Sequence, residues 1–150
     1  MELKFKVSGR IAKPVDKVFE AVVNPAQLSH YFTTGGARGR LETGATVTWD
    51  FADFPGAFPV EVIEVVEDKR IVLRWRGDNA SAADGRTEVI IEFTDTGDRR
   101  TLVEISEHGW RENQAGLDDS YRNCMGWSQM ICALKMWMEH HVNLREGMYK

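Results

Sequence analysis

The sequence predicts an α+β fold, with an antiparallel sheet of about six or seven strands, one long C-terminal helix and two short helices after the first strand. Three observations predict it. Apolar and polar residues alternate in residues 3–11 and, between turn residues, in residues 39–110. Apolar residues recur at helical spacing in residues 14–32, and a longer stripe of them covers residues 118–143.

The first strand and the two short helices are indicated by residues 3–32. In residues 3–11 the apolar side chains fall on one side of the strand and the basic ones on the other. Pro14 suits the first position of a helix, which Asn24 can end. Asn24 can also cap a second helix, which we expect to run from Pro25 to about Phe32.

The middle of the chain predicts a meander of about five or six strands, because turn residues divide its alternating pattern. The turns are expected at residues 43–44, 53–56, 68–69, 77–85 and 95–98. Connections this short favour antiparallel neighbours over crossovers.

The last third predicts a helix of about 26 residues. Its apolar stripe consists of Tyr121, Cys124, Trp127, Ile131, Leu134, Met138 and Val142. A helix with such a stripe needs a sheet to lie against. Gly126 within it costs about 1 kcal/mol relative to Ala, so we expect a neighbouring strand to approach closely at that point.

Length and composition favour one globular domain over residues 1–150, since 43% of the residues are apolar and 28% are charged. The net charge of -4 and the absence of long basic runs disfavour nucleic acid as a partner. No apolar stretch approaches the ~20 residues that cross a bilayer, and the first residues lack the apolar region of a signal peptide. We therefore expect a cytoplasmic protein without membrane insertion.

Four segments, in order, resemble the activator of heat-shock-protein-90 ATPase homologue-like family of the START-like (SRPBCC) superfamily. They are IAKPVDKVFEAVVNPAQLSHYF, GARGRLETGATVTWDF, VEVIEVVEDKRIVLRW and GWSQMICALKMWME. The resemblance extends from Ile11 to about Leu144. It implies the helix-grip fold, in which a curved sheet wraps the last helix and leaves a deep cavity. Different members of the superfamily use that cavity for lipids, polyketides, hormones or other apolar molecules.

Aromatic and methionine side chains are the candidate ligand-binding residues, because they lie on elements that should face one another. They are Trp49, Phe51, Trp75, Phe93, Trp110, Tyr121, Met125, Trp127 and Met130. Such side chains can form the wall of a pocket for an apolar molecule. They can equally fill an ordinary core, and both interpretations stay open.

Glu107 and His108 are the polar candidates for the same site. Strand alternation puts Glu107 on the same face as Val103 and Ile105. If that face is the concave one, desolvation raises the pKa of the carboxyl group and suits it to general acid or base chemistry. A break in the strand near His108 would instead turn Glu107 to solvent.

Motifs for metals, cofactors and nucleophiles are missing from the sequence. There is no HExxH, CxxC, GxSxG or GxGxxG pattern. Cys124 and Cys132 are eight residues apart on one predicted helix, about 12 Å along its axis and too far for a disulfide. We expect no metal, no cofactor and no assigned catalytic residue.

These observations favour a non-enzymatic protein that binds an apolar or lipid-like small molecule between the sheet and the C-terminal helix. Two alternatives stay open. One is a cyclase-like or dehydratase-like enzyme that uses Glu107 or His108 as acid or base. The other is a chaperone-associated or stress-related interaction module, or a homodimer, that uses the surface around Met136 and Trp137.

Overall fold

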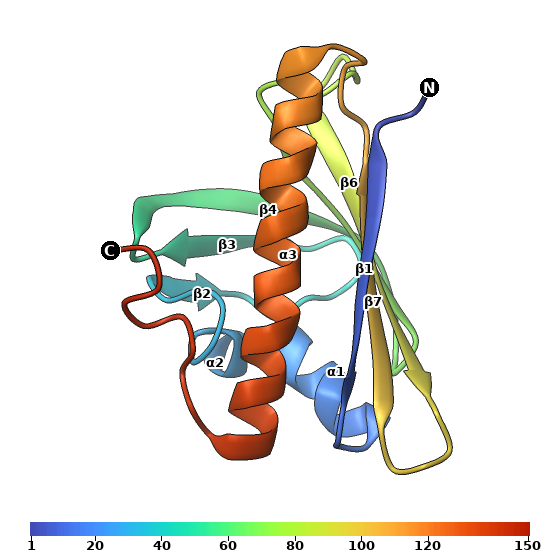
Figure 1. Cartoon of the computed structure of the whole chain (residues 1–150), viewed down its shortest axis with the longest axis vertical. Helices are drawn as coiled ribbons and strands as arrows, with labels where there is room; N and C mark the ends of the chain where they lie inside the picture. Colours follow the sequence, from blue (N-terminus) through green and yellow to red (C-terminus); the bar gives the residue numbers. More distant parts are fainter.

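Seven antiparallel strands form one sheet, and a long helix lies across its concave face (Figure 1). The computed structural model describes the backbone of residues 1–150 and the side chains of all residues except Pro55. The elements are β1 (Lys4–Ile11), α1 (Val15–Val23), α2 (Pro25–Leu28), β2 (Gly36–Arg38), β3 (Thr46–Phe51), β4 (Phe54–Val66), β5 (Arg70–Arg76), β6 (Arg86–Asp95), β7 (Thr101–His108) and α3 (Gln114–His140). The predicted α+β fold is confirmed.

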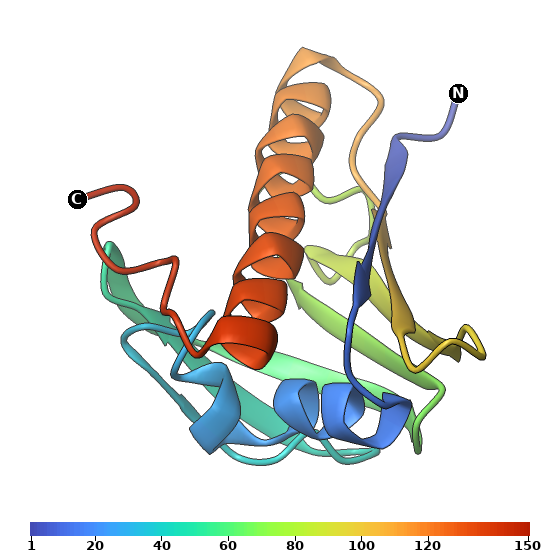
Figure 2. The same cartoon turned by 60° about the horizontal axis from the view of Figure 1, so that its bottom comes forward.

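The strand order is β1-β7-β6-β5-β4-β3-β2, so strands β3 to β7 form the predicted meander and β1 pairs with the last strand. The sheet bends around α3, as Figure 2 shows. Register shifts between Trp49 and Phe51 and between Val62 and Glu64 mark the irregular pairs in β3 and β4. Bulges of this kind increase local twist, which allows one sheet to curve around a helix.

The first short helix begins at Val15, directly after Pro14, and ends before Asn24 as predicted, whereas the second begins at Pro25 as predicted and ends early. Asn24 follows α1, and its side chain accepts a hydrogen bond from the backbone N–H of Ala26 and thereby caps α2. Regular helix ends at Leu28 instead of Phe32. The prediction of a turn at residues 53–56 was also wrong in part, because β4 begins at Phe54.

The long helix begins at Gln114, four residues before the predicted start at 118, and ends at His140, three residues before the predicted end at 143. Its predicted apolar face was wrong at both ends, because Tyr121 is 64% exposed and Val142 lies beyond the helix. The small residues Gly116 and Ser120 occupy the buried positions in the first turns. Hydrophobic periodicity does not register such residues.

The close approach between helix and strand occurs at Gly9 of β1. A Cβ atom at Gly9 would lie 2.7 Å from Cγ2 of Ile131 on α3, whereas a Cβ atom at Gly126 would have no neighbour within 4 Å. The prediction of close strand contact at Gly126 was therefore wrong. The glycine that permits contact is on the strand, and Gly126 leaves open space beside the helix.

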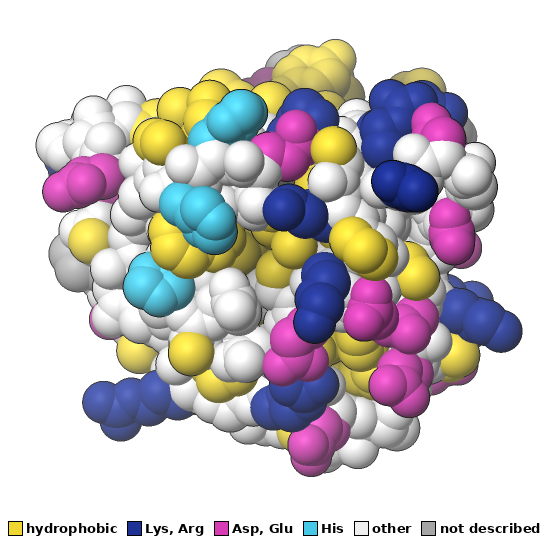
Figure 3. Space-filling view, turned by 90° about the horizontal axis from the view of Figure 1, so that it is seen from below, with side chains coloured by type: hydrophobic (Ala, Val, Ile, Leu, Met, Phe, Trp, Pro, Cys, Tyr) yellow, Lys and Arg dark blue, Asp and Glu magenta, His cyan; other side chains and the backbone are white. Residues whose placement is uncertain are grey.

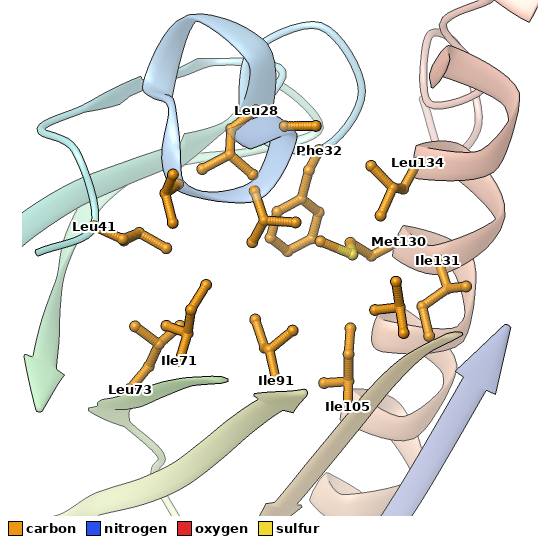
Figure 4. Packing of buried hydrophobic residues seen from close by; sticks show 14 of the residues in the cluster. Leu28, Phe32, Leu41, Ile71, Leu73, Ile91, Ile105, Met130, Ile131 and Leu134 are labelled. Carbon is orange, nitrogen blue, oxygen red and sulfur yellow. The ribbon is translucent and has the colours of Figure 1, made fainter. Parts of the chain in front are cut away.

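The core lies between the sheet, the two short helices and the C-terminal half of α3, as Figure 4 shows. Its labelled members in that view are Leu28, Phe32, Leu41, Ile71, Leu73, Ile91, Ile105, Met130, Ile131 and Leu134. The core therefore fills one end of the space under α3. None of the described helices is long and apolar enough to cross a membrane.

Candidate functional site

An apolar pocket of about 360 Å³ opens beside the N-terminal half of α3. Its walls come from α3, the ends of β3 to β5 and the segment after α3. They consist of Phe32, Phe51, Phe54, Trp75, Arg122, Asn123, Met125, Gly126, Trp127, Arg145 and Tyr149. The rings of Trp75 and Trp127 approach to 5.3 Å between centroids and Phe32 lies 5.4 Å from Trp127, which gives the pocket an aromatic wall.

A larger hollow of about 450 Å³ lies at the loop between β5 and β6. Charged side chains dominate its border, among them Glu61, Arg74, Arg76 and Arg86. Because Arg86 pairs with Glu61 there, the hollow has the character of a solvated, ion-paired surface. The smaller pocket beside α3 is the better candidate for an organic ligand.

Behind the pocket wall, Glu107 is fully buried and receives hydrogen bonds from four side chains. Trp75 Nε1 and Thr87 Oγ1 donate to Oε2 at 2.9 and 2.7 Å, and Trp127 Nε1 donates to Oε1 at 2.9 Å. Asn123 Nδ2 lies 3.1 and 3.0 Å from the two oxygens. The donors come from β5, β6 and α3, so the carboxylate of β7 joins three neighbouring elements.

Burial raises the pKa of the Glu107 carboxyl above its ordinary value, and the hydrogen bonds from Trp75, Thr87, Trp127 and Asn123 partly oppose this effect. All four donors are uncharged. The carboxylate is therefore stabilised by hydrogen bonds without a cation beside it, and its two oxygens are occupied.

The predicted site residues fall into groups. Those that line the pocket are Phe51, Trp75, Met125 and Trp127. Trp49 is buried next to this wall and meets the ring of Trp75 edge-on at 5.9 Å. Phe93 and Met130 belong to the hydrophobic core, where Phe93 packs against Phe19.

The remaining predicted residues lie away from the pocket. His108 faces the opposite side of β7 from Glu107, and its Nε2 atom lies 3.2 Å from Glu88 Oε1. Trp110 is buried against Phe5, with 5.8 Å between the ring centroids. Tyr121 is exposed on α3. The structure thus brings Glu107 towards the pocket wall without its sequence neighbour His108.

Sequence reasoning missed Asn123 and Thr87, which complete the set around Glu107. One signal was available for Asn123, because a residue four positions before Trp127 lies on the same helix face. Thr87 is directly opposite Trp75 in the β5–β6 ladder, but only the observed register reveals that pairing.

The segment after α3 was also missed. Arg145 and Asp53 form an ion pair of 3.1 Å, with only 7% and 9% of their side chains exposed. The guanidinium group of Arg145 lies 4.9 Å from the ring centroid of Tyr149, and Tyr149 packs at 5.7 Å against Phe54. These contacts hold the end of the chain at the pocket.

A second cluster of rings occupies the end of α3. His30 stacks on Trp137 with 4.5 Å between centroids, and His141 meets the same indole edge-on at 5.6 Å. On the face drawn in Figure 3, histidine side chains gather with hydrophobic ones, while acidic and basic side chains intermingle beside them. His30, Trp137 and His141 do not line the pocket beside α3.

The family described as "Activator of Hsp90 ATPase homolog 1-like protein" matches residues 12–139. The chain belongs to this family. The predicted membership is confirmed, and the curved sheet around α3 is a START-like helix-grip fold. A comparison with curated proteins finds no match.

Solved structures with the same fold share little sequence with the chain. DynU16, a protein of the dynemicin biosynthetic locus, has a TM-score of 0.78 and 22% identity over 94% of this chain and 49% of its own, so the chain spans about half of its length. SSP2350 from Staphylococcus saprophyticus has a TM-score of 0.76 and 22% identity over 97% and 96% of the two chains. Aha1 from Colwellia psychrerythraea, solved as a dimer, has a TM-score of 0.76 and 18% identity over 91% of this chain and 96% of its own.

Proposed function

We propose that the chain binds a small apolar molecule in the pocket beside α3. The observation that carries this proposal is the aromatic pocket itself, whose volume of about 360 Å³ is within the range of about 300–1,000 Å³ of ligand sites. Gly126 contributes to it, because a side chain at this position would project into open space. Family membership supports the proposal at the level of the fold.

The same proposal places residues 1–150 in a single domain and the protein in the cytoplasm. The described strands share one sheet and one main core, which supports a single domain. Both cysteines, Cys124 and Cys132, are free thiols, which is typical of a reducing compartment.

The test is calorimetric titration with a panel of alkyl and polycyclic aromatic compounds. We expect Gly126→Leu to weaken binding at least tenfold, because the new side chain occupies the pocket. Cys132→Leu is the matched control, since it adds a leucine at an exposed position of the same helix and should leave binding unchanged. Binding that is equal in the wild type and the Gly126→Leu variant, or no binding by the wild type, rejects the proposal.

An acid–base enzyme that uses Glu107 has less support. The side chain is fully buried behind the wall, and four donors occupy its oxygens. His108 points to the other face of the sheet. A general acid or base must reach its substrate directly or through one water, and neither residue lines the pocket.

Self-association is a second candidate. Aha1 from Colwellia psychrerythraea forms a dimer, and in this chain the neighbouring apolar residues Tyr121 and Met125 are 64% and 52% exposed on α3. Static light scattering tests self-association at protein concentrations of roughly 10 to 200 μM, where a dimer with a micromolar dissociation constant would form. A constant monomer mass over that range rejects a dimer. A chaperone partner has no further support in the contacts of this chain.

A further inference from the structure

Asn123 is the residue that connects the pocket to the buried carboxylate. Its side chain lines the pocket, and its Nδ2 atom donates to both oxygens of Glu107 at 3.1 and 3.0 Å. It stands one helical turn before Trp127, which donates to the same carboxylate. The amide is therefore held from behind, on the side away from the ligand space.

The chemistry of this contact fixes which amide atom faces Glu107. The indole groups of Trp75 and Trp127 can only donate, so the carboxylate oxygens act as acceptors. Turning the Asn123 amide over would place its oxygen against those acceptors. While Glu107 is ionised, as in the test at pH 8 below, Nδ2 must therefore face it, and Oδ1 occupies the other side of the amide, where no donor among the described residues reaches it.

The other polar side chains of the pocket have different capacities. Arg122 and Arg145 offer donors only and pair with Asp119 and Asp53, with Nε of Arg145 left without a partner, whereas the hydroxyl of Tyr149 can both donate and accept. No carboxylate belongs to the described pocket lining. A positively charged ligand would therefore meet two cations, whereas a neutral hydroxyl group can donate to Asn123 Oδ1 without that repulsion.

We infer that the ligand is an apolar molecule with a neutral hydroxyl group, a phenol or an alcohol, which donates to Oδ1 of Asn123. This inference rests on the proposed binding function. Asn123 is the specificity-determining residue. Glu107 is a positioning residue, because it touches the amide and not the ligand.

The test compares ligands that differ in the hydroxyl proton. Dissociation constants of 1-naphthol, 1-methoxynaphthalene and naphthalene are measured by calorimetry at pH 8, and 1-decanol with methyl nonyl ether forms the aliphatic pair. We expect the wild type to prefer one hydroxyl compound over its ether by about five- to thirtyfold, the usual effect of one buried hydrogen bond. The pair that shows this preference decides between a phenol and an alcohol.

Two variants test the roles of Asn123 and Glu107. Asn123→Leu keeps the branched shape and the number of side-chain heavy atoms, and it should lower the hydroxyl-to-ether preference to about twofold or less, whatever its effect on naphthalene affinity. Glu107→Gln gives the amide a partner that both donates and accepts, so the same preference should fall, although the pocket remains. Thermal unfolding of each variant shows whether it is folded.

A measurement on the wild type avoids dependence on either variant. In ¹⁵N spectra, 1-naphthol should shift the side-chain amide signal of Asn123 more than 1-methoxynaphthalene does. Equal affinity for hydroxyl compounds and ethers in the wild type overturns this inference alone. If none of the compounds binds, the proposed function itself fails. An unchanged preference in Asn123→Leu or Glu107→Gln overturns the role of that residue.

Discussion

Trp127 of α3 donates its indole N–H to the carboxylate of Glu107 on β7 over 2.9 Å, and both residues are almost fully buried. The bond joins the helix to the sheet at the pocket wall. An indole ring has one donor and a large apolar face, so the donor fixes the ring while the face lines the pocket. The stability of the fold and the shape of the pocket therefore depend on the same contact.

Replacing Glu107 with Gln should lower the free energy of unfolding at pH 7 by about 1–3 kcal/mol. In the wild type the donors share the two carboxylate oxygens, whereas the amide of the variant has only one oxygen. An indole N–H of Trp75 or Trp127 therefore loses its acceptor. Urea unfolding measures the change. Glu104→Gln on the same strand is the control and should cost less than about 0.5 kcal/mol, because its contact with Lys6 is partly exposed. A Glu107→Gln variant as stable as the wild type contradicts the structural role.

The contribution of Glu107 to stability should decrease as pH rises. Its pKa in the folded state is raised above the ordinary value of 4.5, so the folded protein binds this proton more tightly than the unfolded chain does. The proton-linked part of its contribution is complete below about pH 4.5 and is lost as pH rises through the raised pKa. The part due to the hydrogen bonds that the carboxylate accepts remains at pH 7. Around the carboxyl group, Trp75 of β5, Thr87 of β6, and Asn123 and Trp127 of α3 do not titrate in this range.

The measurement is the free energy of unfolding of the wild type minus that of Glu107→Gln, between pH 4 and 8. Exposed carboxyl groups with a lowered pKa, such as that of Asp98 at about 2, stabilise the protein less as the pH falls. Their contribution is the same in both proteins and therefore cancels in this difference. A difference that stays constant or increases with pH refutes the raised pKa of Glu107.

Alternation along one strand put Glu107 on the face of Val103 and Ile105, which is the buried face of β7, but it left open a break near His108 that would have turned Glu107 to solvent. Its donors were beyond that reasoning. Trp75 precedes it by 32 residues, and the two side chains meet across β6 because the sheet bends. The bulges that produce the bend have no signal in a pattern of period two.

The helix and the end of the chain show two further limits. The predicted stripe of α3 included Tyr121, because aromatic residues count as buried in a periodic pattern, whereas Gly116 and Ser120 take those positions. The ion pair between Asp53 and Arg145 joins residues 92 positions apart in the chain. No periodicity or local motif predicts a contact between a turn and a tail.

Alanine at the two glycines should have opposite effects on stability. Gly9→Ala places a Cβ atom 2.7 Å from Ile131 and should destabilise the protein by about 1–3 kcal/mol through overpacking. Gly126→Ala meets no atom within 4 Å and should stabilise α3 by up to about 1 kcal/mol. Thermal unfolding of the two variants checks both signs. A stabilising Gly9→Ala would refute the close packing of β1 on α3.

Asp53→Asn should release the end of the chain from the pocket. The substitution leaves the guanidinium group of Arg145 buried without a carboxylate, a change that costs about 3–5 kcal/mol when it cannot relax. Here residues 141–150 can detach and return Arg145 to water, so local opening is the expected response. Trypsin should then cleave after Arg145 at least tenfold faster, as mass spectrometry would show. Asp98→Asn, which breaks the exposed pair with Arg100, is the control and should leave that rate unchanged. Equal cleavage of Asp53→Asn and the wild type would mean that the tail is held without this ion pair, by its contact between Tyr149 and Phe54.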